Sequence, residues 1–207
     1  MPFKLYRFLL IGIIVINCCK PYSGKDDGTK LLDYGKFTMR VPQRWTPIIF
    51  NCIDCNAVGF QAGKDTIAAF NYGGFCDPLN EDREYKHFII EEGKLYVPDT
   101  TVKNPEPRTQ YWTYFGKADR LMLEKVRWNK VRWIFIDQYK AKLVTPKQVG
   151  KGITGVYIDS LWELDSSKEQ FVLSGNNLSL VQQQQLLQVI QSLKFYKNRE
   201  LHLHELE

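Results

Sequence analysis

Short runs in which apolar and polar residues alternate constrain the fold of this chain more than any other feature. In the first run, Phe37, Met39 and Val41 alternate with polar residues, and Pro42 ends it. A period of two residues predicts half-buried β-strands. By the same signal, strands are predicted over 58–62, 66–72, 120–128, 131–143, 153–163 and 170–174. Hairpin turns are expected at 63–65 and at 129–130.

The strand expected over 131–143 predicts how the sheet is covered. Ile134 and Ile136 lie on one of its faces. The apolar residues of the other face are Trp133, Phe135, Tyr139, Ala141 and Leu143. A strand that is apolar on both faces is expected to be covered on both sides. We therefore expect a sheet with helices on its two faces.

Two helices are expected. Residues 81–92 have acids in the first turn, apolar residues at helical spacing and a stop at Gly93. Near the end of the chain, Ser179 and Gln182 match a capping box. The apolar stripe that follows consists of Leu186, Val189, Ile190 and Leu193. The proline-rich residues 97–110 are predicted to form an exposed loop.

The stretch Phe37-Thr-Met-Arg-Val-Pro-Gln-Arg-Trp45 resembles the opening strand and Pro-x-x-Trp corner of the PsbP-like superfamily, which includes Ran-binding import factors. The end of the chain is similar too, with a polar turn at 175–177 and a helix that closes on 190–195. The resemblance implies an α+β fold: an α/β/α sandwich with a mainly antiparallel central sheet and a long C-terminal helix. It also implies a binding or assembly role, and it supplies no catalytic residue.

Residues 1–19 have the layout of a lipoprotein export signal. Lys4 and Arg7 precede nine apolar residues, 8–16, which is well short of the roughly 20 residues that span a bilayer. Cys18 and Cys19 follow. We expect cleavage and acylation at Cys19 or Cys18, with Cys19 preferred, and a membrane-anchored lipoprotein of the bacterial cell envelope on its periplasmic or surface side. An uncleaved signal anchor is the alternative.

The predicted organisation is a signal peptide at 1–19, a flexible tether at 20–33, a single globular domain at 34–196 and a polar tail at 197–207. A length of 207 residues favours one domain. The formal net charge of +5 falls to +3 when Lys4 and Arg7 leave with the signal. Such a mild excess does not indicate nucleic acid as a partner. The expected partners are the membrane, through the lipid, and an unidentified envelope protein or ligand.

Three cysteines lie beyond the leader: Cys52, Cys55 and Cys76. Export permits a disulfide among them. Cys52 and Cys55 have C-x-x-C spacing, which serves redox chemistry or half of a zinc site. No second pair follows, so we expect a structural disulfide or buried thiols, with disulfide handling as the alternative.

The sequence offers little for catalysis. Its histidines are His87, inside a predicted helix, and His202 and His204, in the polar tail. A nucleophile–histidine site needs a positioned base, and no phosphate-binding or dinucleotide motif is present. No catalytic residue, cofactor or metal ligand is therefore predicted. Carboxylates from distant strands leave a hydrolase or ligand-processing enzyme as an alternative.

One aromatic cluster is a candidate binding cleft: Tyr111, Trp112, Tyr114 and Phe115. Amphipathic rings suit a glycan or a peptide, although aromatic residues are also ordinary core residues. The leading hypothesis is a lipid-anchored protein whose domain is a non-catalytic binding or assembly module.

Overall fold

The computed structural model describes residues 28–50, 56–80, 87–102, 110–164 and 167–203. Strands make up 52% of these residues and helices 13%. The predicted α/β/α sandwich is therefore wrong: the described chain is mainly β-sheet. Its two helices are α2 (Arg120–Val126) and α3 (Leu180–Ser192).

Seven strands form the main sheet, in the order β3-β4-β5-β14-β11-β10-β9. All neighbours in it are antiparallel. Their bounds are β3 (Thr46–Ile49), β4 (Asn56–Ala62), β5 (Asp65–Gly73), β14 (Gln170–Asn176), β11 (Ile153–Ile158), β10 (Tyr139–Pro146) and β9 (Asn129–Ile136).

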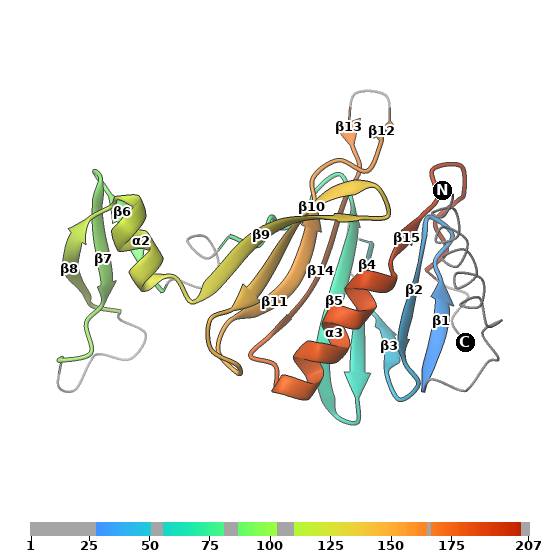
Figure 1. Ribbon diagram of the computed structural model, residues 1–207, viewed down its shortest axis with the longest axis horizontal. Coiled ribbons are helices and arrows are strands. Elements are labelled where there is room, and N and C mark those ends of the chain that lie inside the picture. Colours follow the sequence, from blue (N-terminus) through green and yellow to red (C-terminus); the bar gives the residue numbers. More distant parts are fainter. Residues whose placement is uncertain (1–27, 51–55, 81–86, 103–109, 165–166, 204–207) are drawn as a thin grey trace, which may run out of the picture.

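One face of the main sheet, the inner face, is covered by α3 and by a second sheet (Figure 1). The second sheet has the order β1-β2-β15, with β1 (Thr29–Asp33), β2 (Phe37–Pro42) and β15 (Lys194–Phe195). The Phe37 ring centroid lies 5.0 Å from those of both Phe70 and Phe171. Leu186, Val189 and Ile190 of α3 pack into the same core. Most of the buried aromatic area therefore lies on this face.

A small lobe stands beside the main body (Figure 1). It consists of β6 (Ile89–Glu91), β7 (Lys94–Pro98), β8 (Trp112–Lys117) and α2. Leu95 is fully buried in it. A further short hairpin joins β12 (Glu163–Leu164) to β13 (Ser167–Lys168).

Several local predictions are confirmed. Residues 58–62 and 66–72 lie in β4 and β5, which the turn after Ala62 joins as a hairpin. The strands expected at 37–41 and 170–174 are β2 and β14. The capping box also forms: the Ser179 hydroxyl accepts from the Gln182 N–H at 3.4 Å, and the Gln182 side chain accepts from the Ser179 N–H at 2.9 Å.

The single strand expected over 131–143 is wrong. The chain reverses at Asp137 and Gln138, whose φ angles are 45° and 72°. Positive φ at both central residues suits the tight right-handed twist of a two-residue hairpin. Trp133 and Phe135 consequently pair with Lys142 and Lys140. They do not share a face with Tyr139, Ala141 and Leu143, and the turn expected at 129–130 lies within β9 instead.

Two other elements differ from prediction. Residues 120–128 were expected as a strand, but Asp119 accepts a hydrogen bond from the Met122 N–H at 2.9 Å and begins α2. Of the helix expected over 81–92, residues 81–86 lie outside the described residues and Ile89–Glu91 form β6. Glu92 and Gly93 have positive φ and turn the chain into β7, which a helix does not allow.

Described residues on both sides of 34–196 also contact the folded body. Thr29–Asp33, expected in the tether, form β1 and pair with β2. The described part of the tail packs back, since the His202 N–H donates to the Tyr34 carbonyl at 2.9 Å. Leu201 and Leu203 pack against the main core.

Candidate binding surface

The face of the main sheet opposite α3, the outer face, carries an exposed apolar strip on β9. We define this strip as Val131, Trp133 and Phe135, which are 48%, 60% and 76% exposed. Side chains alternate between the two faces of a strand, so these three lie together on the outer face. Ile134 and Ile136 point the other way and pack into the inner core. Aromatic side chains are thus presented to solvent by an ordered strand.

The rest of the outer face is partly covered by a loop after β5. Leu79 of this loop packs on Val144, Ile153, Tyr157 and Val172, with Cys76 beside them. Register places Val131 opposite Val144, so the strip directly continues the covered cluster. Among the described residues of this loop, Leu79 packs on Val144 of β10, whereas Val131, Trp133 and Phe135 of β9 stay exposed.

Lys142 holds the covering loop in place. Its ammonium donates to the Pro78 carbonyl at 2.7 Å, to the Leu79 carbonyl at 3.3 Å and to the Asn80 side chain at 2.7 Å. Charge-assisted hydrogen bonds of this kind are stronger than neutral ones. A hollow of about 230 Å³ lies beside this contact. Its lining residues are Leu79, Asn80, Arg127, Asn129, Val131, Lys142 and Val144.

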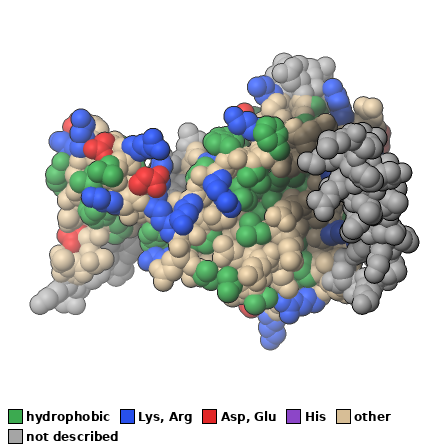
Figure 2. All heavy atoms as spheres, viewed as in Figure 1, with side chains coloured by type: hydrophobic (Ala, Val, Ile, Leu, Met, Phe, Trp, Pro, Cys, Tyr) green, Lys and Arg blue, Asp and Glu red, His purple; other side chains and the backbone are tan. Residues whose placement is uncertain are grey.

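Positive charge lies on both faces of β9. The Lys140 ammonium lies 4.9 Å from the centroid of the Trp133 ring, within reach of a cation–π contact. Lys130 and Arg132 are exposed on the opposite side of β9. Figure 2, which views the side of the sheet that carries α3, shows Lys and Arg side chains along the part of this surface that β9 occupies. Neither β9 nor β10 contains an acidic residue, so the surface favours a partner that combines apolar and acidic groups.

The predicted aromatic cleft lies in the small lobe. Register places Tyr114 opposite Tyr96, and their ring centroids are 5.9 Å apart. Trp112 is half-buried opposite Pro98, while Phe115 is the extra residue at a break in register and is exposed. Tyr111, just before β8, is also exposed. The structure therefore brings Trp112 and Tyr114 onto one edge strand as surface rings.

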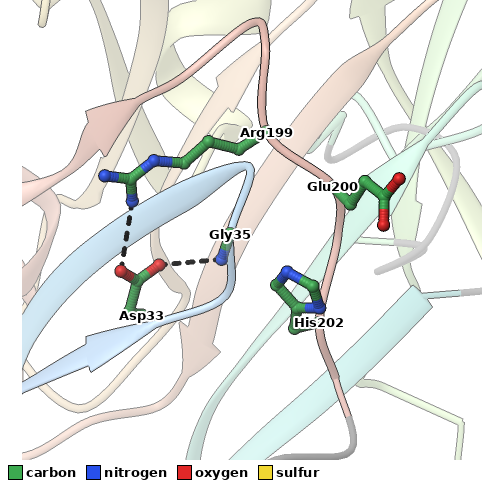
Figure 3. Close-up of a pocket in the computed structure, with 5 residues that line it drawn as sticks. All are labelled: Asp33, Gly35, Arg199, Glu200 and His202. Carbon is green, nitrogen blue, oxygen red and sulfur yellow. Dashed lines mark hydrogen bonds and ion pairs between the residues drawn. The ribbon is translucent and has the colours of Figure 1, made fainter.

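A wider hollow, of about 500 Å³, lies where the tail meets the turn after β1 (Figure 3). Asp33 accepts from the Gly35 N–H at 2.8 Å and from Arg199 at 3.1 Å. A Cβ on Gly35 would lie 1.7 Å from the Glu200 carbonyl, so only glycine fits there. The His202 ring packs against the same glycine. Because the Asp33 carboxylate is committed to these contacts, we assign this hollow to docking of the tail.

The described residues show no cluster of titratable side chains arranged for catalysis. There, no cluster of three or more His, Cys, Asp or Glu side chains is arranged to hold a metal ion. Glu169 accepts from the Trp162 indole at 2.6 Å, and burial raises the pKa of its carboxyl group while Lys36 opposes that shift. This carboxyl group is occupied by a structural hydrogen bond, as expected for a residue that positions an indole.

The cysteines are only partly described. Cys76 is a free thiol that donates to the Asn71 carbonyl at 3.4 Å. Burial raises the pKa of this thiol to about 12, so it is protonated and a poor nucleophile at neutral pH. Cys52 and Cys55, like the leader cysteines Cys18 and Cys19, lie outside the described residues, and the predictions about them stay predictions.

His87, expected on a helix surface, instead stacks on Trp128 with ring centroids 3.4 Å apart. Lys151 lies over the same indole at 4.3 Å. Burial, and then the charge of Lys151, lower the pKa of His87. The imidazole is therefore held neutral as part of a packed stack between the small lobe and the main sheet.

No known protein family model and no curated protein matches this chain. The relationship to the PsbP-like superfamily thus stays a prediction. No helix among the described residues is long and apolar enough to cross a membrane. Sequence reasoning assigned Trp133 and Phe135 to the core and missed the strip. The signal that could have revealed it was the pair Lys140 and Lys142, which share its face once the chain turns at 137–138.

Proposed function

We propose that this protein is a lipid-anchored component of the bacterial cell envelope whose folded domain is a non-catalytic binding or assembly module. The leader supports the anchor: a cationic start and a nine-residue apolar run end at Cys18 and Cys19. The binding role rests on the outer strip of β9.

The strip is the single observation that carries the binding role. Isolated exposed apolar side chains are ordinary on protein surfaces, whereas contiguous ones mark interaction sites. Three successive outward positions of one strand, Val131, Trp133 and Phe135, are exposed together. Burial of such side chains is worth about 1.5–3 kcal/mol each. A partner that covers the strip would gain this free energy.

The rival functions lack a comparable observation. A carboxylate hydrolase needs two facing acids, and Glu169 and Asp33 are each held in structural contacts. A disulfide-handling role would depend on Cys52 and Cys55, which lie outside the described residues. The free Cys76 thiol is half-buried and protonated.

The anchor is tested by mass spectrometry of the protein from its native envelope. We expect an acylated cysteine at the N-terminus and no Met1. Cys19→Ala and Cys18→Ala should be compared, and one of them should release the protein from the membrane fraction. An intact Met1 without acyl chains would overturn the anchor.

The binding role is tested by photo-crosslinking in living cells. A photoreactive residue replaces Trp133 in one strain and Val181, which is equally exposed on α3, in the control strain. We expect a discrete adduct with an envelope protein from position 133 and none from position 181. Equal adducts, or none at position 133, would contradict a binding site on the outer strip.

A further inference from the structure

We propose that β9 is a docking edge that binds an extended, acidic peptide segment of a partner as an additional strand of the main sheet. This rests on the proposed binding function and names the partner's chemistry. Strand addition supplies main-chain hydrogen bonds for affinity and alternate side chains for specificity.

The two edges of the main sheet differ in a way that favours β9. At one edge, β3 has four residues and includes Pro47, both of which are common protections of an edge strand. At the other edge, β9 has eight residues, no proline and a register with β10 that is unbroken from Asn129 to Ile136. Natural proteins rarely leave a long, regular edge open without use.

The turn after β9 fixes which backbone groups face outward. A two-residue loop joins Ile136 to Tyr139, so this flanking pair exchanges hydrogen bonds. Hydrogen-bonded and non-hydrogen-bonded pairs alternate along an antiparallel ladder. The N–H and C=O groups of Val131, Trp133 and Phe135 therefore point away from β10. Within the described part of the chain, no other backbone pairs with them.

The side chains of β9 specify what an added strand should carry. On the outer face, alternate positions of the added strand would lie beside the apolar strip. On the inner face, the intervening positions would lie beside Lys130 and Arg132, which are exposed. Opposite charges on neighbouring strands stabilise a sheet. The complementary segment therefore alternates apolar and acidic residues.

Two other occupants fit less well. A bilayer could cover the apolar strip, but it would leave the outward N–H and C=O groups of β9 without partners, which is costly in lipid. A second copy of this chain could pair β9 with β9, but it would bring the Lys130 and Arg132 side chains of both copies to one face. Like charges on neighbouring strands destabilise a sheet.

The test uses the full chain in detergent solution and fluorescent probe peptides of about nine residues, which is within the usual range of strand lengths. One peptide alternates Val and Glu, and its control alternates Val and Lys. By fluorescence anisotropy, we expect the Val/Glu peptide to bind at least about tenfold more tightly, because charge complementarity suppresses the wrong partner. Equal affinities for the two peptides, or no binding of the Val/Glu peptide, would overturn the proposal.

Two variants distinguish the contribution of main-chain hydrogen bonds to peptide binding from that of the charged side chains. Val131→Pro removes an outward N–H without removing a bond to β10, and it should abolish binding. K130E/R132E keeps the backbone and should reverse the preference in favour of the Val/Lys peptide. Should the proline variant fail to fold by circular dichroism, the charge variant decides, and an unchanged preference there refutes the proposal.

The remaining outcomes are also decisive. Binding to phosphatidylglycerol vesicles that Trp133→Thr abolishes would replace a peptide partner with a membrane. A dimer in sedimentation that Val131→Pro dissociates would replace it with a second copy. If neither peptide binds but position 133 still crosslinks to an envelope protein, strand addition fails while the proposed binding function stands.

Discussion

Both faces of the main sheet carry aromatic side chains, which are buried on the inner face and exposed on the outer face. On the inner face, Phe70 and Phe171 are fully buried beneath α3 and the second sheet, whose Phe37 packs against both rings. On the outer face, Trp133 and Phe135 are mostly exposed. What separates them is the presence of a covering element, so an aromatic residue on a strand belongs to the core only if another segment packs over it.

The largest loss of stability is expected from Phe37→Ala, which removes a buried ring. Removing a buried ring leaves a cavity and costs about 3–5 kcal/mol of unfolding free energy. Trp133→Ser is the matched control on the exposed face and should change stability by no more than about 0.5 kcal/mol. Urea unfolding measures both. A comparable loss in the two variants would mean that the strip is part of the core.

Lys142→Met tests the contacts that hold the covering loop on the outer face. The ammonium holds the carbonyls of Pro78 and Leu79, and the loss of charged hydrogen bonds costs about 1–3 kcal/mol. The loop should loosen and expose Cys76, so alkylation of this thiol should speed up. Lys140→Met, whose lysine lies over Trp133 instead, is the control and should leave the alkylation rate unchanged.

Ser179→Ala tests the helix that covers the inner face. It removes the hydroxyl that accepts from the Gln182 N–H in the capping box. The unfolding free energy should fall by about 1 kcal/mol. Ser179→Asp, which also accepts from the N–H of residue 182, should restore most of the loss. Equal stability of the alanine variant and the parent in thermal unfolding would show that packing alone begins α3.

The smallest expected effect is a dependence of the unfolding free energy on pH through His87. Its pKa is lowered from an ordinary value of 6.5 in the folded state, so folding favours the neutral imidazole. The corresponding stability is complete above pH 6.5 and is lost as the pH falls below it. Relative to His87→Gln, the parent should become less stable between pH 7 and pH 5.5 in urea unfolding. Parallel pH profiles would contradict this stack.

Local signals predicted some of the local elements. The period of two and Gly63 predicted the β4–β5 hairpin, and Ser179 with Gln182 predicted the start of α3, because both depend on neighbours in sequence. The turn at Asp137 and Gln138 was missed because it lacks the glycine that usually marks positive φ. The Asp137 carboxylate instead accepts from the Phe195 N–H at 2.7 Å, a contact between residues 58 apart in the sequence.

Less of the candidate site than of the fold could be predicted from the sequence. The leader and its cysteines can be interpreted from sequence, but they lie outside the described residues. The aromatic residues 111–115 were singled out, and Trp112 and Tyr114 do lie on one edge strand. The exposure of the strip on β9 depends on which segments pack over the outer face, which is a long-range property that no local pattern encodes.

The second sheet has a consequence for how the protein is made. Its central strand, β2, pairs with β1 near one end of the chain and with β15 near the other, and Lys36 donates to the carbonyl of Lys197. Contacts so distant in sequence form late in folding. The second sheet can therefore be completed only after β15 has been synthesised, and until then the edge of β2 that pairs with β15 stays open.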